Sequence, residues 1–506
     1  MPEERKTIEA RLYASPEVYH MARFEKAFPW LLVGGAVLGL LETYRKNAND
    51  RTKSNADIKA ALKNQEHQAE VLKEQIRQFD ENAFKERKAE RRERYTKAVE
   101  QLGDEKAPVR MGGVYTLVGL VDEWLEEESI RKYEDRLKEG QVIINNLCAY
   151  IRSPFTLATR YDELSKDSPI SDGVYKDNQQ EFYTDKAEFK AEADVRLGII
   201  KEIHDRLKGP GGKDPGAWSD FEYDFSGSIF FYPVDLTTSY YKEPVTFRGS
   251  TYQGRAYFGG STYRERANFR NSTYQGQADF SGSTYQDWTS FRNSTYQKGV
   301  LFGGSTYQGR ADFGGSTYQG RADFGGSTYQ DSADFSQSTY KKQAIFNGST
   351  YQSKAYFNDS IYQGKAIFNG STYQGEAVFS GSIFYSDAFW GENNDNGSSS
   401  CFTKYTPTFY QENYHQKTLF GSINNNFTVD NDKGHPIYLN PEGIPLKCKF
   451  LTLEQKEYLE GKFQEIEKIN NKLFEVKDLK EKEELSKKLQ ALNEELHKWR
   501  EEVTTV

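Results

Sequence analysis

Residues 311–343 read ADFGGSTYQGR, ADFGGSTYQDS and ADFSQSTYKKQ, which are three versions of one 11-residue unit. A phenylalanine falls every 11 residues from Phe247 to Phe379, and a tyrosine follows each by five residues until Phe384 closes the series. A small residue, usually alanine, stands two positions before each phenylalanine, and serine stands two positions before each tyrosine. A fixed period of this kind is the signature of a repeat architecture and decides the fold of the segment.

Each unit consists of a five-residue and a six-residue step, both of the form small-x-aromatic. Residues two apart lie on the same side of an extended strand, so the small and aromatic residues share one face. Glycine between them supplies the backbone angles of corners. A helical period of about 3.6 residues is absent from this part of the sequence. A disordered low-complexity tract is the alternative, but such tracts do not keep two aromatic positions in phase. The pattern therefore predicts a β-solenoid with stacked rings inside.

The predicted interior ladders of the solenoid consist of the recurring aromatic residues. They are Phe247, Phe258, Phe269, Phe280, Phe291, Phe302, Phe313, Phe324, Phe335, Phe346, Phe357, Phe368 and Phe379, with Tyr252, Tyr263, Tyr274, Tyr285, Tyr296, Tyr307, Tyr318, Tyr329, Tyr340, Tyr351, Tyr362 and Tyr373.

The strings ADFGG and ANFRN resemble the pattern A-[DN]-[LF]-x-x of the pentapeptide-repeat family. The resemblance implies a right-handed quadrilateral β-helix whose interior holds the central aromatic residue and the alanine two before it. Alternate steps here carry six residues in place of five, so we expect two units, or 22 residues, in each coil. Units that begin from residue 223 to residue 388 would then form about eight coils.

The fold class that we predict is mixed: an α-helical anchor and coil, a HEAT-like helical domain, the parallel β-helix and a C-terminal coiled-coil helix. The predicted divisions are an N-terminal segment 1–26, a transmembrane anchor 27–44, a coiled-coil helix 45–94, an α-helical domain 95–208, a linker 209–220, the solenoid 221–391, an irregular cap 392–450 with one possible further coil (Phe409, Tyr414 and Phe420), and a coiled coil 451–506.

The predicted anchor contains 15 uncharged residues, AFPWLLVGGAVLGLL. That length is short of the ~20 residues of a typical span, although Trp30 and Tyr44 are of the type that lies at membrane interfaces. Gly35 and Gly39 have the spacing that lets two such helices approach closely. A small excess of basic residues after the segment favours a single-pass protein with most of the chain in the cytoplasm. A buried or interfacial helix is the alternative.

Two segments have apolar seams with alternating spacings of four and three residues, which is typical of coiled coils. The first seam is Ile58, Leu62, Gln65, Ala69, Leu72, Ile76, Phe79 and Ala83, and the second is Leu485, Leu489, Leu492, Leu496, Trp499 and Val503. We expect a homo-oligomer formed through these seams, with packing against the chain's own domains as the alternative.

The segment 95–208 shows apolar residues at helical spacing, with a helix that ends at Gly103 and a polar loop at 161–186. Val-Arg pairs near the start of two of its helices resemble those of HEAT repeats. The order RYTKAVEQLG, VRMGGVYTL, CAYIRSPF and WSDFEYDFSG is similar to that of bacterial membrane proteins that carry pentapeptide repeats. The resemblance covers roughly residues 27–390 and implies no defined reaction.

Composition and spacing give no sign of catalysis. The net charge is −8, the three cysteines form no framework, and the six histidines show no metal-ligand spacing. We therefore expect no catalytic residues, cofactor, metal or nucleic acid, and predict a membrane-bound structural or interaction scaffold with an unknown protein partner. A gyrase-binding DNA mimic is the alternative, but mimicry needs a strongly negative surface. Residues 221–391 hold 14 acidic and 14 basic residues, a net charge of 14 − 14 = 0.

Overall fold

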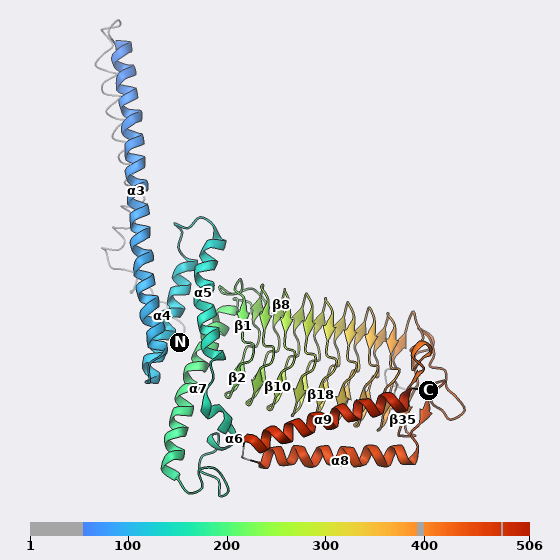
Figure 1. The fold of residues 1–506 in the computed structure, drawn as a ribbon. Helices are drawn as coiled ribbons and strands as arrows, with labels where there is room; N and C mark the ends of the chain where they lie inside the picture. The colour runs from blue at the N-terminus through green and yellow to red at the C-terminus, as the bar shows by residue number, and fades with distance from the viewer. Residues whose placement is uncertain (1–53, 392–398, 477–478, 506) are drawn as a thin grey trace, which may run out of the picture. The chain divides into compact units, whose positions relative to one another are not determined.

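The computed structural model describes residues 54–391, 399–476 and 479–505 (Figure 1). The chain divides into two compact units, residues 1–90 and residues 91–506. Helix α3 (Ser54–Leu102) begins in the first unit and ends in the second. It continues through the predicted boundary at residue 94 because the first helix-breaking residue after Ser54 is Gly103.

The start of the second unit is helical, with α4 (Ala107–Leu125), α5 (Tyr133–Arg152), η1 (Thr156–Arg160), α6 (Tyr161–Leu164) and α7 (Gln179–Leu207). Apolar faces of α4, α5 and α7 pack together around residues such as Leu117, Ile144 and Ile199. The predicted loop 161–186 is wrong in part, since it contains α6 and the start of α7. The side chain of Asn178 caps α7 by accepting a hydrogen bond from the Glu181 N–H.

The solenoid consists of two-residue strands in four parallel sheets. The first sheet contains β1 (Tyr223–Asp224), β5 (Val245–Thr246), β9 (Ala267–Asn268), β13 (Thr289–Ser290), β17 (Ala311–Asp312), β21 (Ala333–Asp334), β25 (Ala355–Tyr356) and β29 (Ala377–Val378). The second contains β2 (Ile229–Phe230), β6 (Thr251–Tyr252), β10 (Thr273–Tyr274), β14 (Thr295–Tyr296), β18 (Thr317–Tyr318), β22 (Thr339–Tyr340), β26 (Ile361–Tyr362), β30 (Ile383–Phe384), β35 (Leu419–Phe420) and β36 (Lys449–Phe450).

The other two sheets complete each coil. The third sheet contains β3 (Val234–Asp235), β7 (Ala256–Tyr257), β11 (Ala278–Asp279), β15 (Val300–Leu301), β19 (Ala322–Asp323), β23 (Ala344–Ile345), β27 (Ala366–Ile367) and β31 (Ala388–Phe389). The fourth contains β4 (Tyr240–Tyr241), β8 (Thr262–Tyr263), β12 (Thr284–Tyr285), β16 (Thr306–Tyr307), β20 (Thr328–Tyr329), β24 (Thr350–Tyr351), β28 (Thr372–Tyr373) and β32 (Cys401–Phe402). A small antiparallel pair, β33 (Tyr410–Gln411) and β34 (Gln416–Lys417), flanks η2 (Glu412–Tyr414).

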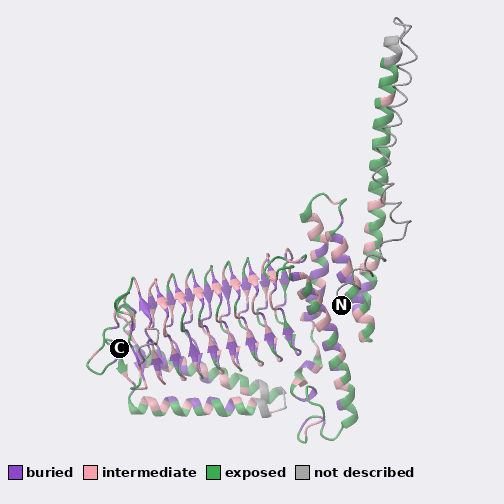
Figure 2. Ribbon diagram, turned by 180° about the vertical axis from the view of Figure 1, so that it is seen from behind, coloured by how far each residue is buried: buried purple, intermediate pink, exposed green. Residues whose placement is uncertain are grey.

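The register confirms a coil of 22 residues. Ala311 in β17 pairs with Ala333 in β21, and Phe313 N–H donates to the Asp334 carbonyl at 2.7 Å. In most two-residue strands of the solenoid one residue is buried and the other is more exposed (Figure 2). About eight turns of parallel sheet result, as the sequence predicts.

The solenoid continues beyond the predicted end of its regular part. Phe402, Phe409, Phe420 and Phe427 stack on the rings of the preceding coil at 4.6, 5.0, 5.4 and 5.2 Å, respectively. The predicted participation of Tyr414 is wrong, because its side chain lies in η2 and is 64% exposed.

Residues 209–220 are also more than a linker. Trp218 is fully buried, and its indole Nε1 donates to Asp122 Oδ1 at 2.8 Å. The preceding Gly216 lies against the end of α7, where a Cβ on residue 216 would come 2.1 Å from the Arg206 carbonyl oxygen. The segment therefore joins the helical region firmly to the first coil.

Helices α8 (Leu453–Glu475) and α9 (Leu479–Thr504) run along the solenoid (Figure 1). Thr452 and Gln455 form a capping box at the start of α8. The apolar residues of both helices pack on outward residues of the second sheet, in one cluster that contains Ile361, Ile383, Leu419, Leu459, Phe463, Ile466, Ile469, Leu492 and Leu496. The second predicted seam therefore packs within the chain, in α9, as the alternative interpretation has it; Leu492 and Leu496 are buried and its other residues are partly buried.

Candidate interaction surfaces

The predicted interior residues form continuous ring ladders. Every one of the phenylalanines and tyrosines in the predicted set is at most 1% exposed. The Phe313 ring stacks on Phe291 at 5.2 Å and on Phe335 at 5.0 Å, and it meets Phe324 edge to face at 5.2 Å. These distances suit favourable aromatic pairs. Because the rings are inaccessible, any partner of the solenoid must bind residues that point outward.

The serine two positions before each tyrosine links neighbouring coils. Ser316 Oγ accepts a hydrogen bond from the Ser294 N–H at 3.2 Å and donates to the Phe291 carbonyl at 3.2 Å. Serine fits here because it is small and carries both a donor and an acceptor. The tyrosine hydroxyls beside this row are buried, and burial raises the pKa of Tyr274, so the phenol stays protonated.

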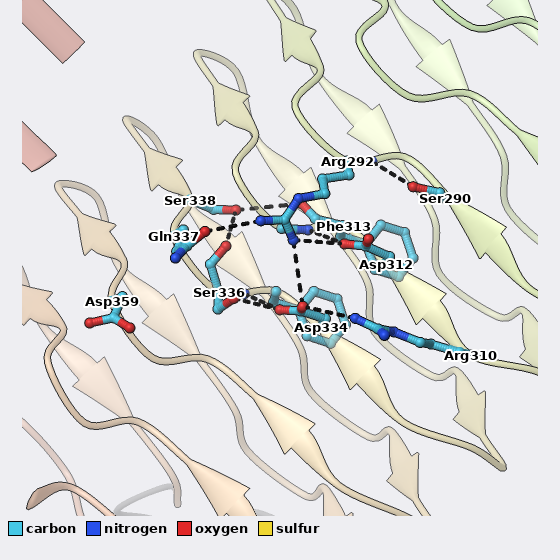
Figure 3. Close-up of polar contacts among 12 residues, drawn as sticks. Ser290, Arg292, Arg310, Asp312, Phe313, Asp334, Ser336, Gln337, Ser338 and Asp359 are labelled. Carbon is cyan, nitrogen blue, oxygen red and sulfur yellow. Dashed lines mark hydrogen bonds and ion pairs between the residues drawn. The ribbon is translucent and has the colours of Figure 1, made fainter. Parts of the chain in front are cut away.

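Two outward aspartates of the first sheet, Asp312 in β17 and Asp334 in β21, form a compact charge cluster with two arginines that lie just outside its strands (Figure 3). Arg292 Nη1 lies 3.4 Å from Asp312 Oδ1 and 3.7 Å from Asp334 Oδ2, while Arg310 Nη2 lies 3.5 Å from Asp334 Oδ2. Burial, and then repulsion from Asp334, raises the pKa of Asp312. Asp312 Oδ1 also accepts from the Gly314 N–H at 3.1 Å.

This cluster is balanced, with two guanidinium groups and two carboxylates that satisfy one another. Because its residues lie on neighbouring coils, its ion pairs link these coils to one another. No group of three or more possible metal ligands occurs among the described residues.

Elsewhere on the outer surface, positive side chains are also paired with negative ones. Such pairs are Arg321 and Asp323 at 2.8 Å, Lys354 and Glu376 at 2.9 Å, and Lys365 and Asp387 at 3.3 Å. Paired charges of this kind do not reproduce the continuous rows of negative charge on a nucleic acid.

The third sheet carries an apolar column near its C-terminal end. Ile345, Ile367 and Phe389 are outward residues of β23, β27 and β31 and face one another in register. Ile367 and Phe389 are partly exposed, whereas Ile345 is buried beside them with 8% of its surface exposed. We call these three residues the third-sheet apolar strip. The sequence analysis missed it, although the signal is readable, since the triplet ADF changes to AIF at 344–346 and 366–368.

A cleft in the helical region contains a buried ionic network. Glu192 accepts from Arg196 Nε at 2.6 Å and from the Tyr150 hydroxyl at 2.9 Å, and lies 3.3 Å from Arg110 Nη2. Burial and the adjacent Glu192 raise the pKa of Tyr150. Arg196 also donates to the Ile151 carbonyl at the end of α5. The arginines of both Val-Arg pairs thus meet at one carboxylate and join α4, α5 and α7.

The first predicted seam lies on an exposed face of α3. Leu62, Leu72, Ile76 and Phe79 are 46, 37, 43 and 72% exposed, respectively. Gln65 is half-buried, and the side chain of Ile58 lies outside the described residues. This face is an extended apolar surface of the first unit.

The predicted anchor residues Trp30, Gly35, Gly39 and Tyr44 lie outside the described residues. In the part of the chain that the structure describes, no helix combines the length and the apolar character that a membrane span requires.

Comparison with known proteins supports the repeat assignment. Residues 242–284 match the model of a family described as Pentapeptide repeats (9 copies). Neither the curated proteins nor the solved structures contain a match to the chain. The matched segment lies within the stacked coils, with their 22-residue register and buried ring ladders. The middle of the chain is therefore a β-solenoid built from pentapeptide-type repeats.

Proposed function

We propose that this chain is a non-catalytic, membrane-anchored scaffold that binds a protein partner on its solenoid and associates with itself through α3. The observation that carries the partner proposal is the third-sheet apolar strip, since aligned apolar side chains on a fixed framework are typical of protein-binding surfaces. The buried ladders keep this framework rigid, so the strip is presented in one geometry.

Cross-linking and pull-down from membranes tests the partner proposal. The full chain is compared with Ile367→Asp, and with Thr306→Asp on the fourth sheet as the matched control. We expect a captured protein to be lost with Ile367→Asp and kept with Thr306→Asp, while both variants retain the far-ultraviolet spectrum of the parent. Capture that is the same for all three chains would contradict a role of the strip.

The membrane part of the proposal rests on the apolar segment 27–41 and its aromatic flanks. Single-pass insertion would leave most of the chain in the cytoplasm. We expect carbonate washing of membranes to release a chain without residues 1–50 and to leave the full chain bound. Equal release of both would exclude the anchor.

The alternative function, a DNA mimic that binds gyrase, is disfavoured because the outer charges pair with each other. From the resemblance to pentapeptide-repeat proteins of bacterial membranes we infer further that the coils wind right-handed. The helices α4, α5 and α7 would then pair in the manner of HEAT repeats.

A further inference from the structure

We propose that α3 pairs with α3 of a second copy in an antiparallel orientation, in one register centred between Glu70 and Val71. The inference rests on the proposed self-association and specifies its geometry. It is carried by three features of residues 59–80: an exposed apolar stripe, a charge pattern beside it, and the sizes of the seam residues.

The apolar stripe is long enough for a stable contact. The seam from Leu62 to Phe79 spans 17 intervals, or about 26 Å at ~1.5 Å per residue. Its large side chains are exposed, as described above. Apolar residues spaced alternately by three and four residues are buried when two helices pack along them.

The charges beside the stripe alternate in sign. Each of four charged residues directly follows a seam residue, at intervals of seven: Lys59, Glu66, Lys73 and Asp80. All four side chains are exposed, and within the described part of the chain none of them forms an ion pair. The residues on the opposite flank of the stripe are uncharged, namely Ala61, Gln68, Gln75 and Asn82.

An antiparallel pair brings the charged flanks of the two helices together. In the proposed register Lys59 faces Asp80 of the second copy, and Glu66 faces Lys73 of the second copy. Two-fold symmetry repeats both contacts, so all eight charges are paired with opposite ones. Flanking charges of this kind set orientation and register in coiled coils.

Other arrangements lose this complementarity. A shift by one heptad in one direction places Lys59 against Lys73 and Glu66 against Glu66. A shift in the other direction places Glu66 against Asp80 and Lys73 against Lys73. A parallel pair places the charged flank against the uncharged one.

The seam residues favour the same register. Leu62 then packs against Phe79 of the second copy, and Ala69 packs against Leu72 of the second copy. In a parallel, in-register pair Ala69 would face Ala69 and leave a gap, and Gln65 would face Gln65. Layers of matched total volume pack more favourably than a layer of two small residues.

Disulfide trapping with the full chain in detergent tests the orientation. Gln65→Cys and Ile76→Cys are made separately, and one of them carries a mass tag. The native cysteines Cys148, Cys401 and Cys448 are buried, which keeps the background low. We expect mixed cross-linked dimers of the two variants, because position 65 faces position 76 of the second copy.

Gln65→Cys by itself should form no dimer. Its two copies would lie about 16 Å apart along the helix, beyond the ~7 Å between Cα atoms that a disulfide spans. A dimer of Gln65→Cys with itself, or the absence of the mixed dimer, would overturn the proposal.

Charge reversal tests the register. Lys73→Glu turns two attractive contacts into two repulsive ones, so we expect dimerisation of the full chain to weaken about tenfold. Glu66→Lys combined with Lys73→Glu should restore the parent affinity, because the pair is rebuilt with opposite polarity. Lys63→Glu, on the outer side of the helix, is the matched control. Sedimentation velocity at several concentrations measures each variant.

Failure of the proposed self-association and failure of the proposed register give different results. A parent chain that stays monomeric at every concentration would overturn the self-association itself. A dimeric parent whose double variant remains as weak as Lys73→Glu would overturn the register, while self-association by another geometry would stand.

Discussion

Single residues in a left-handed backbone conformation make one set of solenoid corners. The second residue after each ladder phenylalanine has φ near +60°, and glycine supplies most of these positions, as at Gly326 with φ +68°. Thr238 has φ +54° at an equivalent corner. A β-branched residue is unfavourable there because its Cβ crowds the backbone.

Replacing glycine by alanine at these corners should destabilise the solenoid, and replacing threonine by glycine should not. Gly326→Ala should lower the free energy of unfolding by about 1 kcal/mol, since the site has room for a Cβ and only the backbone conformation is disfavoured. Thr238→Gly should leave stability unchanged or raise it by up to about 1 kcal/mol. Chemical denaturation of the full chain measures both, and a stabilising Gly326→Ala would contradict the explanation.

Truncation of a ladder ring should be far more costly than truncation of an outward side chain. Phe313→Ala should cost about 3–5 kcal/mol, because rings above and below prevent the cavity from closing. Gln308→Ala is the control, since Gln308 is exposed, and should change stability by less than about 0.5 kcal/mol. The equivalent Gln319 is unsuitable, because its side chain donates to Asn470 in α8 at 3.3 Å. Similar small effects of Phe313→Ala and Gln308→Ala would contradict burial in register.

At the scale of elements, the α8–α9 pair combines an apolar contact with a few polar ones. Arg500 Nη1 lies 2.5 Å from Asp359 Oδ1, and His497 Nε2 lies 3.3 Å from Thr339 Oγ1. Lys341 lies in the same contact, and burial lowers its pKa to about 8, with Glu467 opposing the shift. The contact therefore holds titratable groups on both sides.

The contact between α9 and the solenoid should weaken in mild acid. Burial, and then Arg500, lowers the pKa of His497 from 6.5 to about 4. The undocked helix therefore binds a proton more readily, and the docking free energy should fall by roughly 2–3 kcal/mol as the pH drops from about 6.5 to 4. Hydrogen exchange of α9 at several pH values measures this loss.

His497→Gln is the control for the other groups at this contact, which are Lys341, Asp359, Glu467 and Arg500. It should remove most of the pH dependence in that window. If α9 of the variant opens in acid as readily as the parent, a group other than His497 is responsible.

At the scale of the whole molecule, α8 and α9 link many coils that otherwise contact only their neighbours. Repeat arrays lose cooperativity when contacts are confined to adjacent units. Twenty-three residues of α8 extend about 35 Å, the height of roughly seven coils at ~4.8 Å each. The contacts from Gln319 to Leu419 span five successive strands of the second sheet, from β18 to β35.

Removal of residues 452–506 should therefore split the unfolding of the second unit. The coils that carry Ile361, Ile383 and Leu419 should melt at a lower temperature, and these residues should bind a hydrophobic dye. Differential scanning calorimetry of the truncated and full chains tests this expectation. A truncated chain that melts in one transition at the parent temperature would show that the helices add no cooperativity.

The amino-acid sequence alone was enough to predict the β-solenoid, the residues of its interior and the 22-residue coil. These features repeat along the chain, and each ladder residue contacts residues a fixed number of positions away in the sequence. The period of the sequence is therefore sufficient to predict the contacts. The break in the helix at Gly103 was equally readable, because it depends on local backbone preference.

The features that do not repeat depend on contacts between distant parts of the folded chain. The burial of Trp218 against Asp122, the choice of Phe427 over Tyr414 for the last coil, and the docking of Leu496 near Ile383 join residues far apart in the chain. A heptad seam such as that of α9 has the same pattern whether it packs on a second copy or on its own solenoid. Only the folded chain distinguishes them, because it places the seam in one cluster with Ile361 and Ile383. The five preceding strands of the second sheet, from β6 to β22, carry threonine at the equivalent position.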